Sequence, residues 1–149
     1  MKNPLRRSLL KKHGIRAFLC HSHEDKEAVH ALHSKLRRDS VDVWLDKEKL
    51  LPGQNWKVEI RKAILKSDVV IVCLSRRFNQ HKGFRHEEIN IALKKTDLFL
   101  DNEIYIIPVR LEKCDLPTSL GHLHRVDLFE AGGYKKLLQA LWEQIKSQR

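Results

Sequence analysis

The sequence predicts an α/β fold in which helices pack on both faces of one parallel β-sheet. Short apolar, β-prone runs alternate along the chain with segments of helical periodicity. One of these runs, VVIVCL at residues 69–74, is apolar at every position, which is typical of a central parallel strand covered on both faces. The alternation continues to the end of the chain, with no internal repeat and no low-complexity segment.

The first half of the chain predicts two strands and two helices. Residues 14–20 are predicted to form a strand. A helix is predicted to follow within residues 21–38, where Ser22 and Asp25 have capping-box spacing. Residues 41–45 form the second strand, and the polar segment 46–55 carries a Pro-Gly turn signal. The inward stripes of the two helices are predicted to be Ala28, Val29, Leu32 and Leu36 in the first and Trp56, Ile60, Ala63 and Ile64 in the second, which ends near residues 67–68.

The second half continues the pattern. After the strand at 69–74 come a predicted loop at 75–83, a helix at 84–96, a strand at 103–111 and a short strand at 125–129. A closing helix points Leu137, Leu138, Leu141, Trp142 and Ile145 inward. Five strands joined by right-handed crossovers favour the flavodoxin-like order 2-1-3-4-5. Ligands of such sheets bind beyond the carboxyl ends of the first and third strands, so the loop at 21–23 and the loop at 75–83 should form the two sides of a crevice.

Size and composition indicate one soluble globular domain. The 149 residues include 42% hydrophobic and 32% charged residues, enough for a core without disulfides or a metal. Residues 1–14 contain five Lys or Arg and no acid, which predicts a basic arm or linker ahead of a domain at 15–149. Because the chain has neither a signal peptide nor an apolar run long enough to cross a bilayer, we expect a cytoplasmic protein with no membrane partner.

The net charge of +10 permits binding to a polyanion. A nucleic-acid partner is not expected, because no aromatic residues alternate with the basic ones and no nucleic-acid-binding motif is present. The histidine pairs His21/His23 and His122/His124 lack a cysteine placed to complete a zinc site, so we expect no metal and exposed loop histidines. The three cysteines form no CxxC pair, which indicates small core residues in a reducing compartment.

The stretch GFRHEEINIAL at residues 83–93 contains two adjacent glutamates in different positions on the predicted helix. On a helical wheel Glu88 falls within the apolar arc, whereas Glu87 shares the opposite side with Asn90 and Lys94. An inward carboxylate is costly unless it is paired. The pattern alone therefore leaves open whether Glu88 is a structural residue held by a cation or the helix N-terminus, or a functional residue at the crevice.

Taken together, these motifs and three others resemble a Toll/interleukin-1 receptor (TIR) domain of the bacterial type. The resemblance rests on FLCHSHED (18–25), LDKEKLLPGQNW (45–56), the apolar third strand ending in Ser75, and the GFxxxEI helix start, in the order and spacing of that family. It covers residues 15 to about 146. It implies a role in bacterial immune, antiphage or cell-death signalling, with other TIR domains as partners and a separate or fused sensor domain.

The resemblance also implies an activity. Some TIR domains cleave the nicotinamide–ribose bond of NAD+, which is their substrate and not a cofactor, and active copies pack together through the BB loop, here Leu50, Leu51, Pro52 and Gly53. The family's aromatic-xxx-Glu pattern maps onto Phe84 and Glu88, which makes Glu88 the implied catalytic residue, although many catalytic members have Trp at the first position. Implied substrate contacts are Phe18, Ser22, Trp44, Asp46, Lys47, Ser75, Arg76, Arg77 and Phe84.

Two other functions fit the same sequence pattern. TIR domains that act as interaction modules without turnover often lack the glutamate found at position 88. A nucleoside deoxyribosyltransferase-like enzyme would share the sheet and a carboxylate but would act on nucleosides in place of NAD+. The product of an NAD+-cleaving enzyme, linear or cyclised ADP-ribose, depends on which nucleophile reaches the ribose carbon.

Overall fold

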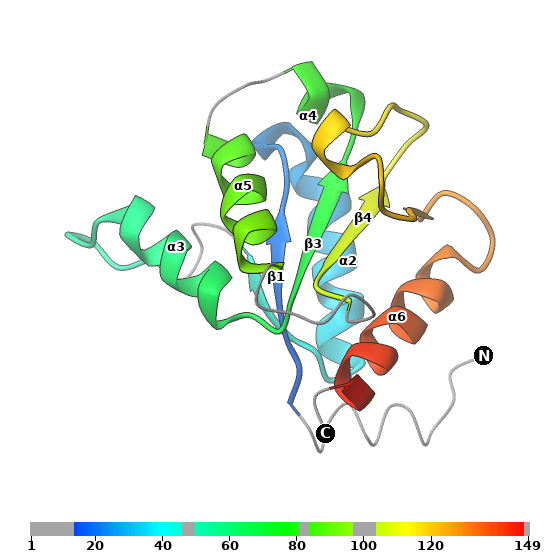
Figure 1. The fold of residues 1–149 in the computed structure, drawn as a ribbon, viewed down its shortest axis with the longest axis horizontal. Coiled ribbons are helices and arrows are strands. Elements are labelled where there is room, and N and C mark those ends of the chain that lie inside the picture. Colours follow the sequence, from blue (N-terminus) through cyan, green and yellow to red (C-terminus); the bar gives the residue numbers. More distant parts are fainter. Residues whose placement is uncertain (1–13, 46–49, 81–83, 97–103, 148–149) are drawn as a thin grey trace.

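A computed structural model describes residues 14–45, 50–80, 84–96 and 104–147, which form one α/β domain (Figure 1). Its five strands are all parallel and lie in the order β2-β1-β3-β4-β5, as predicted. The strands are β1 (Arg16–Cys20), β2 (Asp42–Leu45), β3 (Val69–Leu74), β4 (Ile106–Arg110) and β5 (Val126–Asp127). The helices are η1 (His23–Asp25), α2 (Lys26–Arg38), α3 (Trp56–Lys66), α4 (Arg76–Gln80), α5 (Phe84–Thr96), η3 (Thr118–Leu120) and α6 (Gly133–Ser147).

Alternation of side chains along the strands divides the core into two apolar clusters, one on each face of the sheet. Leu19 of β1 and Ile71 of β3 point to the face covered by α2 and α6, and Phe18 and Val70 point to the face covered by α3 and α5. Figure 1 shows α3 and α5 on one side of β1 and β3 and α2 on the other. All six residues of β3 are buried, which confirms it as the central strand.

Both ends of α3 are closed by side-chain hydrogen bonds. At its start the Asn55 side chain accepts from the backbone N–H of Lys57 (3.2 Å) and of Val58 (3.4 Å). At its end Lys95 of α5 donates to the carbonyls of Leu65 and Ser67, and the Tyr105 hydroxyl donates to the carbonyl of Ile64 at 2.9 Å. Desolvation lowers the pKa of Lys95. These contacts tie α3 to α5 and to the segment before β4.

The far edge of the sheet is held by an ion pair between its last two strands. The Arg110 guanidinium donates to both carboxylate oxygens of Asp127, at 2.6 and 2.8 Å, and also to the Cys114 carbonyl at 2.9 Å. The hydrogen bond from Arg110 lowers the pKa of the Asp127 carboxyl. Gly133 starts α6 against this strand, where a side-chain Cβ would lie 2.1 Å from the Asp127 carbonyl oxygen.

Three local predictions are wrong. The predicted loop after β3 contains a short helix, α4, because Phe78 is buried there and Ser75 caps the turn by accepting from the Phe78 N–H at 3.0 Å. The capping box does not form, since a 3-10 turn precedes α2 and the Asp25 carboxylate instead accepts from the Ser75 hydroxyl. Ala28 is exposed, so the inner stripe of α2 is Val29, Leu32 and Leu36.

Strand lengths differ from the prediction at the end of the chain. The fourth strand is shorter than predicted, with Leu111 outside it, and β5 contains two residues in place of five. Position 103 lies outside the described residues. None of the described helices is long and apolar enough to cross a membrane.

Candidate active site

The face that α5 turns toward the sheet carries one carboxylate. Glu88 is 3% exposed and lies beside the buried Ile89 and Ala92, whereas Glu87 and Asn90 are exposed. The orientation predicted from the helical wheel is therefore confirmed. Leu74 and Phe78 belong to the same apolar cluster as Ile89.

Glu88 reaches the carboxyl end of β1. The Cys20 thiol donates to Glu88 Oε1 across 3.6 Å, and both residues are buried. Cys20 is the last residue of β1, and its register partner on β3 is Val72. The carboxylate thus lies where β1 and β3 are neighbours, which is the position at which a flavodoxin-like sheet binds ligands.

An aromatic pair lies on the same face of the sheet and joins β1 to the edge strand β2. The rings of Phe18 on β1 and Trp44 on β2 stack with centroids 5.2 Å apart and planes 15° from parallel. The two residues are register partners, which explains the stacking. Phe18 is fully buried and Trp44 is half-buried, so an aromatic surface extends from the core to the β2 edge.

Side-chain contacts connect the two predicted sides of the crevice. The buried Ser75 hydroxyl, after β3, donates to the Asp25 carboxylate of η1. Arg77 of α4 pairs with the Glu24 carboxylate at 3.6 Å and donates to the Glu24 carbonyl at 3.1 Å. The segment after β1 and the segment after β3 are thereby held against each other.

The remaining predicted polar contacts occupy different places. Ser22 is fully buried, and its hydroxyl accepts from the Glu24 N–H at 3.4 Å, so it caps η1 as expected of a cap residue. Arg76 faces another loop: its backbone N–H donates to Glu112 at 2.9 Å, and its guanidinium lies 4.0 Å from the same carboxylate. Arg77 is therefore nearer to the β1 loop than Arg76 is.

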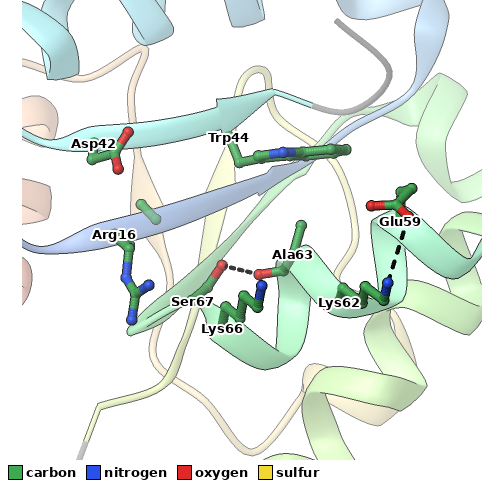
Figure 2. A pocket seen from close by; sticks show the side chains of 9 residues that line it. Arg16, Asp42, Trp44, Glu59, Lys62, Ala63, Lys66 and Ser67 are labelled. Carbon is green, nitrogen blue, oxygen red and sulfur yellow. Dashed lines mark hydrogen bonds and ion pairs between the residues drawn. The ribbon is translucent and has the colours of Figure 1, made fainter. Parts of the chain in front are cut away.

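A cavity of about 250 Å³ lies between α3 and the strands β1 and β2. Figure 2 shows Trp44 at one end of it, Arg16 and Asp42 on the strands, and charged side chains of α3 on the opposite wall. Glu59 pairs with Lys62 at 3.7 Å within this wall. Of the predicted site residues, Trp44 borders this cavity and Glu88 does not.

A second cavity, of about 220 Å³, lies between β5 and α6. His124, Arg125 and Lys136 contribute positive or titratable groups to it, and Asp127 and Glu130 contribute carboxylates. It is separated from the carboxylate of α5 by the width of the sheet from β1 to β5. The sequence did not predict either cavity.

The segment between β2 and α3 forms an exposed turn over the part of it that is described. The Leu51 carbonyl accepts from the Gln54 N–H at 3.1 Å, and Gly53 has a φ of +88°, so the predicted Pro-Gly turn is confirmed. Leu51 is 67% exposed, and Pro52 is exposed beside it. Leu50 is half-buried. An apolar side chain is thus presented to solvent at the tip of this loop.

Some predicted site residues cannot be placed. Asp46 and Lys47 lie outside the described residues, and so does the side chain of Phe84, whose backbone begins α5. Among the described residues, Glu88 lies next to β1 and the aromatic pair lies on the same face of the sheet. Ser75 and Arg77 are joined to η1.

Two residues with contacts at this end of the sheet, Cys20 beside Glu88 and Asp25 beside Ser75, were not predicted to matter. Cys20 was expected only to fill the core, and Asp25 only to cap a helix. Alternation along β1 places Cys20 on the same face as Phe18, and this signal was available in the sequence.

His21 is buried, contrary to the prediction of an exposed loop histidine, with its Nδ1 donating to the Ser22 carbonyl at 2.8 Å. His23, His122 and His124 are exposed as predicted.

Comparisons with known proteins agree with this fold. The family model described as "TIR domain" matches residues 17–142. The chain is 36% identical over 81 residues to a Theionarchaea archaeon protein named NAD(+) hydrolase TcpA, a match covering 54% of this chain and 25% of that protein. It is 30% identical over 122 residues to the uncharacterized protein y4cD of Sinorhizobium fredii, covering 80% of this chain and 19% of that protein. The chain thus spans a quarter or less of these two curated relatives.

Among solved structures, the TIR domain of the Toll-related receptor TRR-2 from Hydra magnipapillata superposes with a TM-score of 0.70 at 23% identity. The superposition covers 87% of this chain and 97% of that domain, which supports the fold. The family model covers most of the chain. The chain therefore belongs to the TIR domain family.

Proposed function

We propose that this TIR domain is an NAD+ glycohydrolase in which Glu88 is the catalytic residue. The observation that carries the proposal is the burial of Glu88 on the sheet-facing side of α5, with its carboxylate against the carboxyl end of β1. The named function of the archaeal relative, NAD(+) hydrolase, supports it, because that relative is 36% identical over 81 residues.

The chemistry requires only one carboxylate. Nicotinamide is cationic in NAD+, so when the C–N bond to ribose breaks, the electron pair goes to the ring nitrogen and nicotinamide leaves as a neutral molecule without a general acid. Ordinary glycosides expel an alkoxide and need a second carboxyl group as the acid. Water then adds to the ribose carbon and loses a proton, which gives ADP-ribose, nicotinamide and one H⁺.

Glu88 would act on the charge that develops on the sugar. As the C–N bond lengthens, positive charge appears on the ribose, and a carboxylate in a low-dielectric site stabilises that charge more than water does. In this proposal the Phe18–Trp44 pair supplies the aromatic wall, and Ser22 and Ser75 shape the ribose position. The pyrophosphate is assigned to Arg76 or Arg77, with Asp46, Lys47 and Phe84 completing the substrate contacts.

A direct assay tests the proposal. Concentrated protein is incubated with NAD+, and free nicotinamide is measured by chromatography at several protein concentrations. Glu88→Ala should lower the rate at least about 100-fold, because it removes the group that stabilises the transition-state charge. The control is Glu87→Ala, which removes an exposed carboxylate one position away and should leave the rate within about twofold of wild type, as expected for a group outside the site.

The outcomes separate the proposal from its rivals. Equal rates in wild type and Glu88→Ala would reject the assignment. Release of base from nucleosides, with NAD+ left intact, would indicate a nucleoside-processing enzyme. If the wild type releases no nicotinamide at any concentration but self-associates, the domain is an interaction module.

We further propose that activity depends on packing of several copies through the loop at Leu50–Gly53. The supporting observation is that Leu51 is 67% exposed at the tip of a defined turn, where it contributes little to the core of its own domain. Leu51→Asp should change the free energy of unfolding by less than about 0.5 kcal/mol. It should also lower nicotinamide release per molecule and abolish the increase of specific activity with protein concentration. Unchanged concentration dependence would contradict this proposal.

A further inference from the structure

Two buried cysteines on neighbouring strands have different surroundings. Cys73 on β3 belongs to the apolar cluster beneath α2 and α6, where burial raises its pKa to about 12. Cys20 on β1 points to the other face, and its Sγ lies 3.6 Å from Glu88 Oε1. Both side chains are at most 1% exposed, so they differ in what they contact and not in how deeply they are buried.

The direction of the contact follows from the chemistry of the two groups. The Cys20 thiol carries the donor hydrogen and Glu88 Oε1 is the acceptor. Cys20 is 1% exposed and Glu88 is 3% exposed, so little water is available to compete for the carboxylate oxygen. An S–H group is a weak donor in water, but a hydrogen bond to a charged acceptor is stronger in a low-dielectric environment.

The backbone of Cys20 is a rigid support for this donor. β1 lies between β2 and β3, with Leu19 paired to both Leu45 and Ile71, and Cys20 paired to Val72. Glu88 in contrast sits on α5 at the end of a side chain with three rotatable bonds. A donor fixed in the middle of the sheet therefore limits the positions that the Glu88 carboxylate can take.

We propose that Cys20 is a positioning residue that holds the Glu88 carboxylate at the carboxyl end of β1 through its thiol hydrogen bond. The inference rests on the proposed function of Glu88 and deepens it. Cys20 acts through Glu88 and is not assigned a contact with the substrate. The competing explanation is that the thiol only fills space in the core.

Two substitutions distinguish a donor from a space-filling group. Cys20→Ala removes the donor and some volume, and Cys20→Ser removes similar volume but keeps a donor. We expect Cys20→Ala to lower kcat about five- to tenfold with KM within about twofold, because a poorly placed catalytic group slows the chemical step more than it weakens binding. Cys20→Ser should recover at least about half of the wild-type kcat.

The matched control is Cys73→Ala, which removes a buried thiol from the neighbouring strand on the opposite face of the sheet. It should lower the melting temperature while leaving kcat of the folded enzyme within about twofold of wild type. The positioning role is overturned if Cys20→Ala retains the wild-type kcat, or if Cys20→Ser and Cys20→Ala lose it equally.

A second measurement does not depend on activity. The infrared S–H stretch of Cys20 is assigned as the band that Cys20→Ala removes, and the Cys73 band is assigned with Cys73→Ala. We expect the Cys20 band at lower frequency than the Cys73 band, because a hydrogen bond weakens the S–H bond. It should move to higher frequency in Glu88→Gln, whose amide oxygen is a weaker acceptor than a carboxylate.

This measurement separates two kinds of failure. If the wild type releases no nicotinamide, the proposed function fails, and the infrared band still decides whether the thiol holds Glu88. If Cys20→Ala does not fold, Cys20→Ser, which also removes the thiol, assigns the band, and the infrared comparison of wild type with Glu88→Gln carries the test. A Cys20 band that does not move in Glu88→Gln overturns the inference.

Discussion

The two faces of the sheet are built from the same strands, and direct side-chain bonds join elements on both, such as the bond from the Tyr105 hydroxyl to the Ile64 carbonyl beneath α3 and α5. Beneath α2 and α6, polar groups make direct bonds between elements: the Tyr134 hydroxyl donates to Asp39 at 2.6 Å, and the Gln144 amide donates to the Asp68 carbonyl at 2.9 Å. Beneath α3 and α5, the carboxylate of Glu88 meets a thiol at 3.6 Å. A thiol is a much weaker donor than a hydroxyl or an amide.

The buried polar groups beneath α2 and α6 have a structural explanation. The bonds of Tyr134 and Gln144 join α6 to distant parts of the chain and are of the kind that stabilise a fold. Burying a carboxylate costs free energy of desolvation unless its partners compensate for that cost. Under the proposed function, the face with α3 and α5 holds its buried carboxylate, Glu88, for catalysis.

The largest effect should come from the apolar core of the α2/α6 face. Leu141 is fully buried in the middle of α6. Leu141→Ala leaves a cavity and should lower the free energy of unfolding by about 2–5 kcal/mol, measured by urea denaturation. A loss below about 1 kcal/mol would show that α6 packs loosely, and the comparison of the two faces would then lose its reference.

An intermediate effect is expected from the ion pair at the sheet edge. Asp127→Asn removes a carboxylate that accepts two hydrogen bonds from Arg110 and should lower the free energy of unfolding by about 1–3 kcal/mol at pH 7. The pKa of Asp127 is lower in the folded protein, so its contribution is fully present above the unfolded pKa of about 3.9. The contribution is lost as pH falls through the folded pKa.

The measurement is a comparison of wild type and Asp127→Asn in urea between pH 7 and pH 2. The difference between the two proteins should stay constant down to about pH 5 and then shrink. A difference that grows as the solution becomes acidic would contradict the assignment of the lowered pKa to the bond with Arg110.

The smallest effect on stability should come from the carboxylate itself. Glu88→Gln keeps the volume and the acceptor oxygen but removes the charge, so the free energy of unfolding should stay the same or rise by up to about 2 kcal/mol. Glu87→Gln, on the exposed side of α5, is the control and should change nothing measurable. A loss of more than about 2 kcal/mol in Glu88→Gln would identify Glu88 as a structural anchor, and the contrast between the two faces would disappear.

The features that follow from periodicity were predictable. The all-apolar run at 69–74 identified β3, the alternation of strands and helices led to the order of the sheet, and the wheel of α5 separated Glu88 from Glu87. Each of these depends on a repeat of side-chain directions along one element. Such repeats are visible in the sequence because burial selects them directly.

Features that depend on contacts between distant segments were not predictable in the same way. The helix α4 has five residues, too few for a periodic signal, and its stability comes from burial of Phe78. Asp25 has a spacing typical of a cap but bonds to Ser75, which is 50 residues away. The Cys20–Glu88 contact joins positions 68 apart, so the sequence indicated the faces of both residues but not their meeting.

The link between Arg77 and Glu24 has a consequence for how the domain would respond to salt. The Arg77 side chain is 58% exposed and that of Glu24 is 48% exposed, so added ions screen their attraction. An anionic ligand that recruits this guanidinium must displace a resident carboxylate, so the net gain is the difference between two attractions. Moderate ionic strength weakens both, and a doubly charged ligand would lose more than the single carboxylate that it replaced.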